Sequence, residues 1–265
     1  AINSSYAPAL TNLGSIELNT GNKQEALSLL IKATESDPQL APAWGNLAKG
    51  YLQLGKIQEA EISIRKSIEL NPHLFNAHFL LGTILLGQKK LQEAELPLRK
   101  TIELKPDLFQ AHLNLGAILK DLGQLQEAEI STRKAIELKP DFFQAHLNLG
   151  AILKNLGQLP EAEFSIRKAI ELNPNLFNSH FLLANVLIDQ EKFQDAEISL
   201  RKSIDLKPDF LQAHLNLGAV LKELGQLQEA EISIRKSIEL NPNLFNSHFL
   251  LGTILFGQRC ISWLI

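Results

Sequence analysis

FQAHLNLGAILK, the twelve residues from Phe109 to Lys120, decides the fold because it returns unchanged at residues 143–154. It returns again, with two substitutions, at residues 211–222. A second version, FNAHFLLG at residues 75–82, reappears in closely similar form at residues 177–184 and 245–252. The copies within each version start whole multiples of 34 residues apart. A fixed period of this length is typical of an array of stacked repeats.

Seven prolines share this period and frame the repeats. With each proline taken as position 32, residues 1–6 form a leader that fits the end of a preceding repeat. Seven full repeats follow over residues 7–244, starting at residues 7, 41, 75, 109, 143, 177 and 211. An incomplete eighth repeat with a divergent apolar tail occupies residues 245–265. Repeats three, six and eight begin with Phe-Asn and are called the Phe-Asn repeats below. Since the chain begins with alanine and stops within a repeat, we expect it to be part of a longer protein.

Each repeat carries the apolar periodicity of two helices. In repeat four, His112, Leu115, Gly116 and Leu119 follow the spacing i, i+3, i+4, i+7, which places them on one helix face. A second apolar face follows a break at residues 121–123. Pro140 ends it, because proline lacks a backbone N–H and disfavours helix at the preceding residue. Position 8 is Gly or Ala in every repeat and position 20 is Ala in repeats one to seven, so the helices can approach closely. The sequence therefore predicts an all-α solenoid of 34-residue helix-turn-helix repeats.

This pattern resembles the tetratricopeptide repeat family over nearly the whole chain. Repeat two carries it most fully, with the motif residues Trp44, Leu47, Ala48, Tyr51, Ala60, Ile64, Ser67 and Pro72. The resemblance implies antiparallel helix pairs stacked into a right-handed superhelix. It also implies that the first helices line a concave groove that binds peptides or partner proteins.

Composition excludes several other classes of protein. The formal net charge is -3 and 21% of the residues are charged, which gives no basic excess for nucleic acid. Cys260 is the only cysteine, so no internal disulfide can form, and no Cys/His spacing fits a metal site. The longest apolar runs are about eight residues, well short of the ~20 that span a bilayer, and no signal peptide is evident. We therefore expect a cytoplasmic protein without membrane insertion.

Several residues depart from the repeat pattern. Pro97 lies inside the second helix of repeat three and is expected to kink it or to alter the repeat angle, at a cost of ~3 kcal/mol. Pro160 falls in a first helical turn, where proline is tolerated. Thr132 replaces the large aliphatic residue found at position 24 in repeats two, three, five, six and seven, and is expected to weaken that contact by roughly 1 kcal/mol. The turn glycine at position 15 is missing from the Phe-Asn repeats, which have Lys89, Glu191 and Arg259 there, so their turns are expected to differ.

No constellation of residues indicates catalysis, and we expect neither a cofactor nor a metal site. Six histidines occupy position 4, but equivalent positions in stacked repeats lie roughly 10 Å apart, too far to share an ion bound at ~2 Å. Packing is the favoured role, with a pH-sensitive ladder as the alternative. Glu, Arg and a further acid recur at positions 21, 25 and 29, which fits i, i+4 pairs on a solvated convex face. No isolated carboxylate pair, catalytic triad or phosphate-binding glycine loop occurs.

The candidate site is the concave face that the family resemblance assigns to positions 2, 5, 6, 9, 12 and 13. An amide offers both a donor and an acceptor, so a ladder of asparagines can bind the backbone of an extended peptide. Similar ladders occur in the repeat domain of O-linked N-acetylglucosamine transferases. The predicted peptide-binding residues are the asparagines Asn12, Asn46, Asn114, Asn148 and Asn216, the lysines Lys120, Lys154 and Lys222, and, as apolar anchors, the phenylalanines Phe79, Phe181 and Phe249. The alternative is that the Asn and Lys residues only keep an open surface hydrated.

The sequence does not favour a receptor for chaperone C-termini. Asn12 and Asn46 match such carboxylate-clamp members, but Asn76 and Leu80 stand where those members need basic residues. We interpret the chain as a non-catalytic scaffold for protein or peptide partners. One alternative is the substrate-recognition region of a larger, O-linked N-acetylglucosamine transferase-like enzyme. Another is self-assembly into a homo-oligomer through an uncapped C-terminal face, since the sequence after Gln258 abandons the repeat and places Trp263 and Ile265 where glutamates stood.

Overall fold

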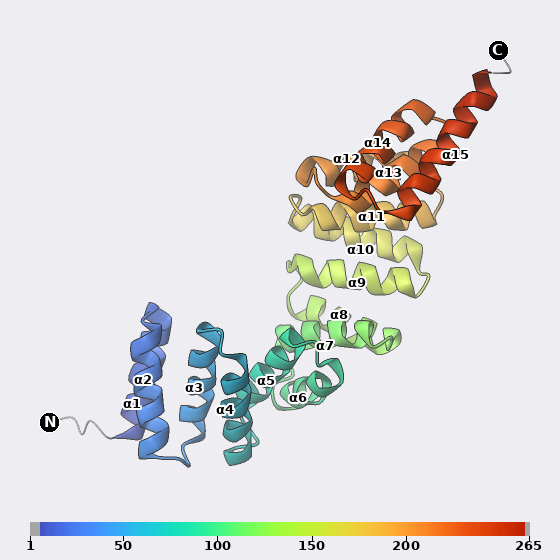
Figure 1. The fold of residues 1–265 in the computed structure, drawn as a ribbon. Helices are drawn as coiled ribbons and strands as arrows, with labels where there is room; N and C mark the ends of the chain where they lie inside the picture. The colour runs from blue at the N-terminus through green and yellow to red at the C-terminus, as the bar shows by residue number, and fades with distance from the viewer. Residues whose placement is uncertain (1–5, 263–265) are drawn as a thin grey trace. The chain divides into compact units, whose positions relative to one another are not determined.

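The computed structural model describes the backbone of residues 6–262 and the side chains of residues 6–259. This part of the chain holds fifteen helices and no strand, which confirms the all-α prediction (Figure 1). Leader residues 1–5 and the tail residues Trp263 and Ile265 lie outside the described residues, as does the side chain of Cys260.

The chain divides into two compact units, residues 1–138 and residues 139–265. Consecutive helices pack as pairs, one pair for each repeat. In the first unit the pairs are α1 (Ala7–Thr20) with α2 (Lys23–Ser36), α3 (Ala41–Gln53) with α4 (Ile57–Leu70), α5 (Phe75–Gly87) with α6 (Leu91–Leu104), and α7 (Phe109–Asp121) with α8 (Leu125–Leu138). In the second unit they are α9 (Phe143–Asn155) with α10 (Leu159–Leu172), α11 (Phe177–Asp189) with α12 (Phe193–Leu206), and α13 (Leu211–Glu223) with α14 (Leu227–Leu240), followed by α15 (Phe245–Ser262).

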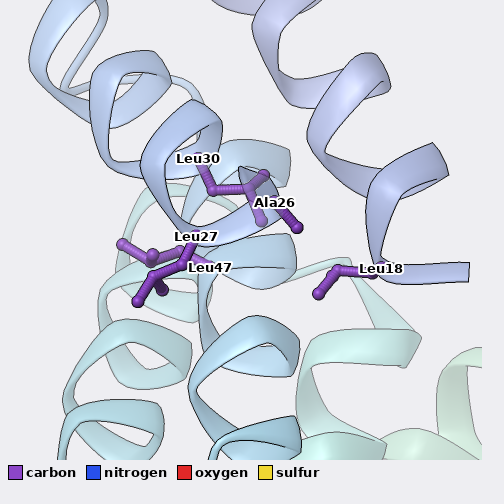
Figure 2. Packing of buried hydrophobic residues seen from close by; sticks show 5 residues of the cluster. All are labelled: Leu18, Ala26, Leu27, Leu30 and Leu47. Atoms are coloured by element: carbon purple, nitrogen blue, oxygen red, sulfur yellow. The ribbon is translucent and has the colours of Figure 1, made fainter. Parts of the chain in front are cut away.

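Within a pair, the two helices pack closely where a small residue of the first helix faces a large residue of the second. A Cβ atom added to Gly14 of α1 would lie 2.7 Å from Leu30 of α2, and one added to Gly82 would lie 2.7 Å from Leu98. Figure 2 shows the cluster around Leu30, in which α1, α2 and α3 all contribute buried side chains. The glycine at position 8 therefore sets how closely the two helices of a repeat can pack.

The turn inside each pair needs one residue with a left-handed backbone. In five repeats this residue is glycine, with φ between 74° and 89°. Lys89 and Glu191 adopt the same conformation at φ 60°, so the prediction of different turns in repeats three and six is wrong. Closure of the hairpin imposes this backbone, and a side chain at such a position costs about 1–2 kcal/mol. In repeat eight the prediction is confirmed, because α15 continues as helix through Arg259.

Position 4 connects consecutive repeats. The Nε2 atom of each of the six predicted packing histidines lies 2.7–2.9 Å from the carbonyl oxygen of the proline six residues earlier, as in His112 with Pro106. Trp44 donates the equivalent hydrogen bond to Pro38 at 3.0 Å. Because a carbonyl only accepts hydrogen bonds, each histidine must carry its proton on Nε2. These contacts support the packing role and orient the first helix of each repeat.

The two internal prolines fit their helices. α6 continues through the buried Pro97 and has the same 14-residue length as α4, so the proline does not end the helix. The Pro97 carbonyl accepts a hydrogen bond from Thr101 Oγ1 at 2.8 Å. A kink or a change in repeat angle at Pro97 stays a prediction. Pro160 lies in the first turn of α10, as expected.

Candidate peptide-binding groove

In the first unit, the predicted asparagines lie on the first helices of their pairs. Asn12 is exposed, whereas Asn46 and Asn114 are half-buried. Asn46 lies in a cavity of about 130 Å³ between α3 and α5, beside Lys49 and Leu80. The side-chain amide of Asn114 makes no hydrogen bond within the described part of the chain. The half-buried side-chain amides of Asn46 and Asn114 are therefore available to a ligand. Asn46 Oδ1 also makes a long contact of 3.5 Å with Lys49 Nζ.

In the second unit, the structure brings predicted and unpredicted residues together in one pocket. A cavity of about 300 Å³ is lined by Lys154 from α9, by Asn185, Ile188 and Asp189 from α11, by Phe193 from α12, and by Asn216, Ala219, Val220 and Glu223 from α13. Of the predicted residues it includes Asn216 and Lys154. We call it the α11–α13 pocket.

The amides of the α11–α13 pocket form a pair. Asn216 Nδ2 donates a hydrogen bond to Asn185 Oδ1 at 2.8 Å. This leaves the Asn185 amino group as a donor and the Asn216 carbonyl as an acceptor. If both side-chain amides are turned by 180° about their last bond, so that oxygen and nitrogen change places, the pair still keeps one free donor group and one free acceptor. The pair can thus bind both the C=O and the N–H of an extended peptide backbone.

The predicted lysines are all ion-paired. Lys154 Nζ lies 2.8 Å from Asp189 in the neighbouring repeat, whereas Lys120 and Lys222 pair at 3.1 Å with the acids that directly follow them, Asp121 and Glu223. Such partly exposed pairs contribute about 0–1 kcal/mol, so a ligand can displace them at little cost.

The three predicted phenylalanine anchors lie in different surroundings. Phe181 is half-buried, and its ring centroid lies 4.8 Å from that of Phe210, which also contacts Phe177. Phe79 is half-buried, and Phe249 is 64% exposed and stacked on Phe245 at 6.2 Å. The aromatic cluster holds Phe181 in place, so of the three rings Phe249 presents the most surface to a partner.

Sequence analysis missed the other three polar residues of the α11–α13 pocket, Asn185, Asp189 and Glu223, as well as its apolar lining. A signal was present, because Asn185 is the only asparagine at position 9 of any repeat. Asp189 and Glu223 are likewise the only carboxylates that occupy position 13 in two consecutive repeats. A comparison of positions between neighbouring repeats identifies these three residues, but not the residues that they contact.

Comparison with protein families agrees with this geometry. Models described as tetratricopeptide repeat match residues 7–40, 41–74, 109–142, 143–176, 177–210 and 211–244. The chain belongs to the tetratricopeptide repeat family. No curated protein matches the sequence of this tetratricopeptide repeat chain.

Solved structures share the tetratricopeptide fold of the chain. YrrB, described as a tetratricopeptide repeat protein with an unusual peptide-binding site, has a TM-score of 0.63 and 23% identity over 69% of this chain and 95% of its own. The pilF protein of Pseudomonas aeruginosa has a TM-score of 0.69 and 20% identity over 80% of this chain and 97% of its own. The C-terminal part of a repeat protein from Cytophaga hutchinsonii has a TM-score of 0.71 and 15% identity over 91% and 99%. At these identities the similarity concerns the fold.

Charged residues on the second helices of the tetratricopeptide array join consecutive repeats. Arg65 of α4 contacts Glu93 of α6 at 3.3 Å, and Arg99 contacts Glu127 of α8 at 2.5 Å. Glu61 accepts hydrogen bonds from Arg65 at 2.8 Å and from Gln88 and Lys90 of the next repeat at 3.0 and 3.1 Å. The predicted solvated face therefore also links repeats to one another.

Glu61 titrates abnormally because of these contacts. Partial burial acts to raise the pKa of Glu61, but hydrogen bonds from Arg65, Gln88 and Lys90 outweigh it and lower that pKa to about 2. The same balance of burial against hydrogen bonds from Lys192 and Arg167 lowers the pKa of Glu163 in the second unit. These carboxylates are consequently charged at neutral pH and have a structural role.

The second helices also expose one apolar residue in each of repeats two to seven. This residue occupies position 22 and is 67–75% exposed; the set is Ile62, Leu96, Ile130, Phe164, Ile198 and Ile232.

Within the described residues, no group of three His, Cys, Asp or Glu side chains is placed to hold a metal ion. None of the described helices combines the length and apolar character that crossing a membrane requires.

Proposed function

We propose that the chain is a scaffold that binds extended peptides or protein partners through the first helices of its repeats. The observation that carries the proposal is the Asn185–Asn216 amide pair, which lines a cavity and keeps a free donor and a free acceptor. The Asn46 amide lines a second cavity, and the Asn114 and Asn148 amides are half-buried and unbonded within the described residues. The proposal assigns no catalytic step to the chain.

Half-buried amides favour binding over simple hydration of the surface. A surface that only needs to stay hydrated can use any exposed polar residue, whereas a half-buried amide gains most from a partner that satisfies both its donor and its acceptor. An extended peptide supplies such groups at regular intervals along its backbone. The asparagines at position 6 recur with each repeat except the Phe-Asn ones, where leucine takes their place.

The test compares two variants that each lose four amides. The groove variant replaces Asn46, Asn114, Asn148 and Asn216 with Ala, and the control variant replaces Gln58, Gln126, Gln194 and Gln228, which are exposed on the second helices. Both variants should keep the helicity of the native chain. In a pull-down from a lysate of the source cell, the groove variant should lose partners that the control variant retains. Loss from the control variant alone would place binding on the second helices and contradict the proposal.

A second candidate function, self-association, is favoured by the surface of α15. Phe245, Phe249 and Phe256 are 64–75% exposed on this helix. A Cβ atom added to Gly252 would have no described atom within 4 Å, whereas the other position 8 glycines face a side chain of the next helix. Light scattering tests this candidate. A mass that rises with concentration for the native chain, and not for Phe249→Ser, would support it, and a constant monomer mass would refute it.

A further inference from the structure

We propose that the α11–α13 pocket selects peptides that carry a lysine or arginine side chain. This inference rests on the proposed function and adds a chemical class of ligand at one place in the groove. The pocket lies entirely within the second unit and combines the amide pair, an apolar floor and two carboxylates.

The charge of the pocket favours a cation. Its lining includes one cationic side chain, Lys154, and two anionic ones, Asp189 and Glu223. Asp189 neutralises Lys154 at 2.8 Å. Among the described residues, Glu223 pairs with Lys222, the residue directly before it at the exposed end of α13, at 3.1 Å, and Lys222 is not part of the pocket lining. Among the residues that line the pocket, two carboxylates therefore stand against one lysine, and the side chain of Glu223 is 52% exposed to an incoming ligand.

The shape of the pocket fits a long aliphatic side chain with a charged end. Ile188, Phe193 and Val220 provide apolar surface beside the carboxylates of Asp189 and Glu223. Lysine and arginine place their methylene stems along apolar surface while the charged group stays at the polar edge. Two carboxylates from consecutive repeats also match the several N–H groups of a guanidinium. The amide pair can bind the backbone of the same residue or its neighbour.

The cavity beside Asn46 in the first unit provides a contrast, although it lies at other repeat positions than the α11–α13 pocket. That cavity lies between α3 and α5 and is lined by Asn46 and Asn76, but its only charged residue is Lys49. Position 13, which supplies Asp189 and Glu223 to the α11–α13 pocket, holds Gln53 and Gly87 in repeats two and three. This cavity is therefore not expected to prefer a cationic side chain.

The test is a selection of random 12-residue peptides displayed on phage against the immobilised full chain. The selected peptides should be enriched in Lys or Arg at a fixed position. Their affinity, measured by fluorescence anisotropy, should fall about tenfold in a variant with Asp189→Asn and Glu223→Gln, as expected for loss of a charge-assisted hydrogen bond. The variant with Asp121→Asn, which changes position 13 in repeat four, should bind them as the native chain does.

A reversal of preference separates recognition from a structural effect. In the Asp189→Asn, Glu223→Gln variant, Lys154 becomes the only charged residue of the pocket lining, so peptides selected against that variant should carry Asp or Glu instead. Selected peptides that depend on the position 6 asparagines but show no basic residue would overturn this inference and leave the proposed function standing. A selection that yields no peptide dependent on those asparagines would overturn both.

Discussion

Replacing Thr132 with isoleucine should stabilise the protein by about 2 kcal/mol. Thr132 is completely buried in α8, and its hydroxyl has no hydrogen-bond partner among the described residues. An unsatisfied buried hydroxyl costs about 1–3 kcal/mol, and each additional buried methylene contributes about 0.8 kcal/mol. Repeats five and seven show that isoleucine fits, because Ile166 and Ile234 fill the same place over Gly150 and Gly218 and are likewise fully buried.

Urea unfolding followed by far-ultraviolet circular dichroism measures this gain. The Thr132→Val variant removes the hydroxyl at nearly constant volume, so it should recover about 1 kcal/mol and separate the polar contribution from the apolar one. The reverse change, Ile166→Thr, should destabilise the chain by a similar 1–3 kcal/mol. An unchanged or lower urea midpoint for both Thr132 variants would refute the reasoning, since it would mean that the hydroxyl is satisfied or that the slot is smaller than in repeat five.

Three further predictions concern stability. The Glu61 carboxylate has a pKa lowered to about 2, so its contribution to folding stability is present above the unfolded pKa near 4.5 and is lost as the pH falls toward 2. Glu61→Gln should therefore make the urea midpoint depend less on pH over this range, and an unchanged pH dependence would contradict this. Lys89→Gly and Glu191→Gly should each raise the midpoint of thermal unfolding, because glycine relieves about 1 kcal/mol of strain at φ 60°, and a lowered midpoint would show that the side chain contributes more than the strain costs. Gly150→Ala should destabilise the chain by about 1–3 kcal/mol because the new Cβ meets a packed side chain, whereas Gly252→Ala, with open space around it, should not; equal effects on the urea midpoint would contradict the packing account.

Much of the fold follows from the period. Pro106 and Pro140 bound a single repeat, and the apolar spacing from His112 to Leu119 identifies its first helix. The turn prediction for Lys89 is wrong because residue preference does not decide the backbone conformation there. In the structure, closure of the hairpin decides it, and the side chain tolerates the left-handed conformation.

The composition of the candidate site was harder to predict because it depends on contacts between repeats. Asn216 at position 6 bonds to Asn185 at position 9 of the preceding repeat, 31 residues away. Lys154 at position 12 pairs with Asp189 at position 13 of the following repeat, 35 residues away. Neither separation equals the repeat period, so a comparison of equivalent positions does not show these pairs. They follow from the way neighbouring first helices are offset when they pack.

The most direct test of the central claim is a nuclear magnetic resonance titration of side-chain amides with a selected peptide. The account predicts that the amino resonances of Asn185 and Asn216 shift on binding, while those of Gln194 and Gln228 on the second helices stay unchanged. Shifts confined to the glutamines of the second helices, with the asparagine resonances unmoved, would contradict the claim that the first helices form the binding face.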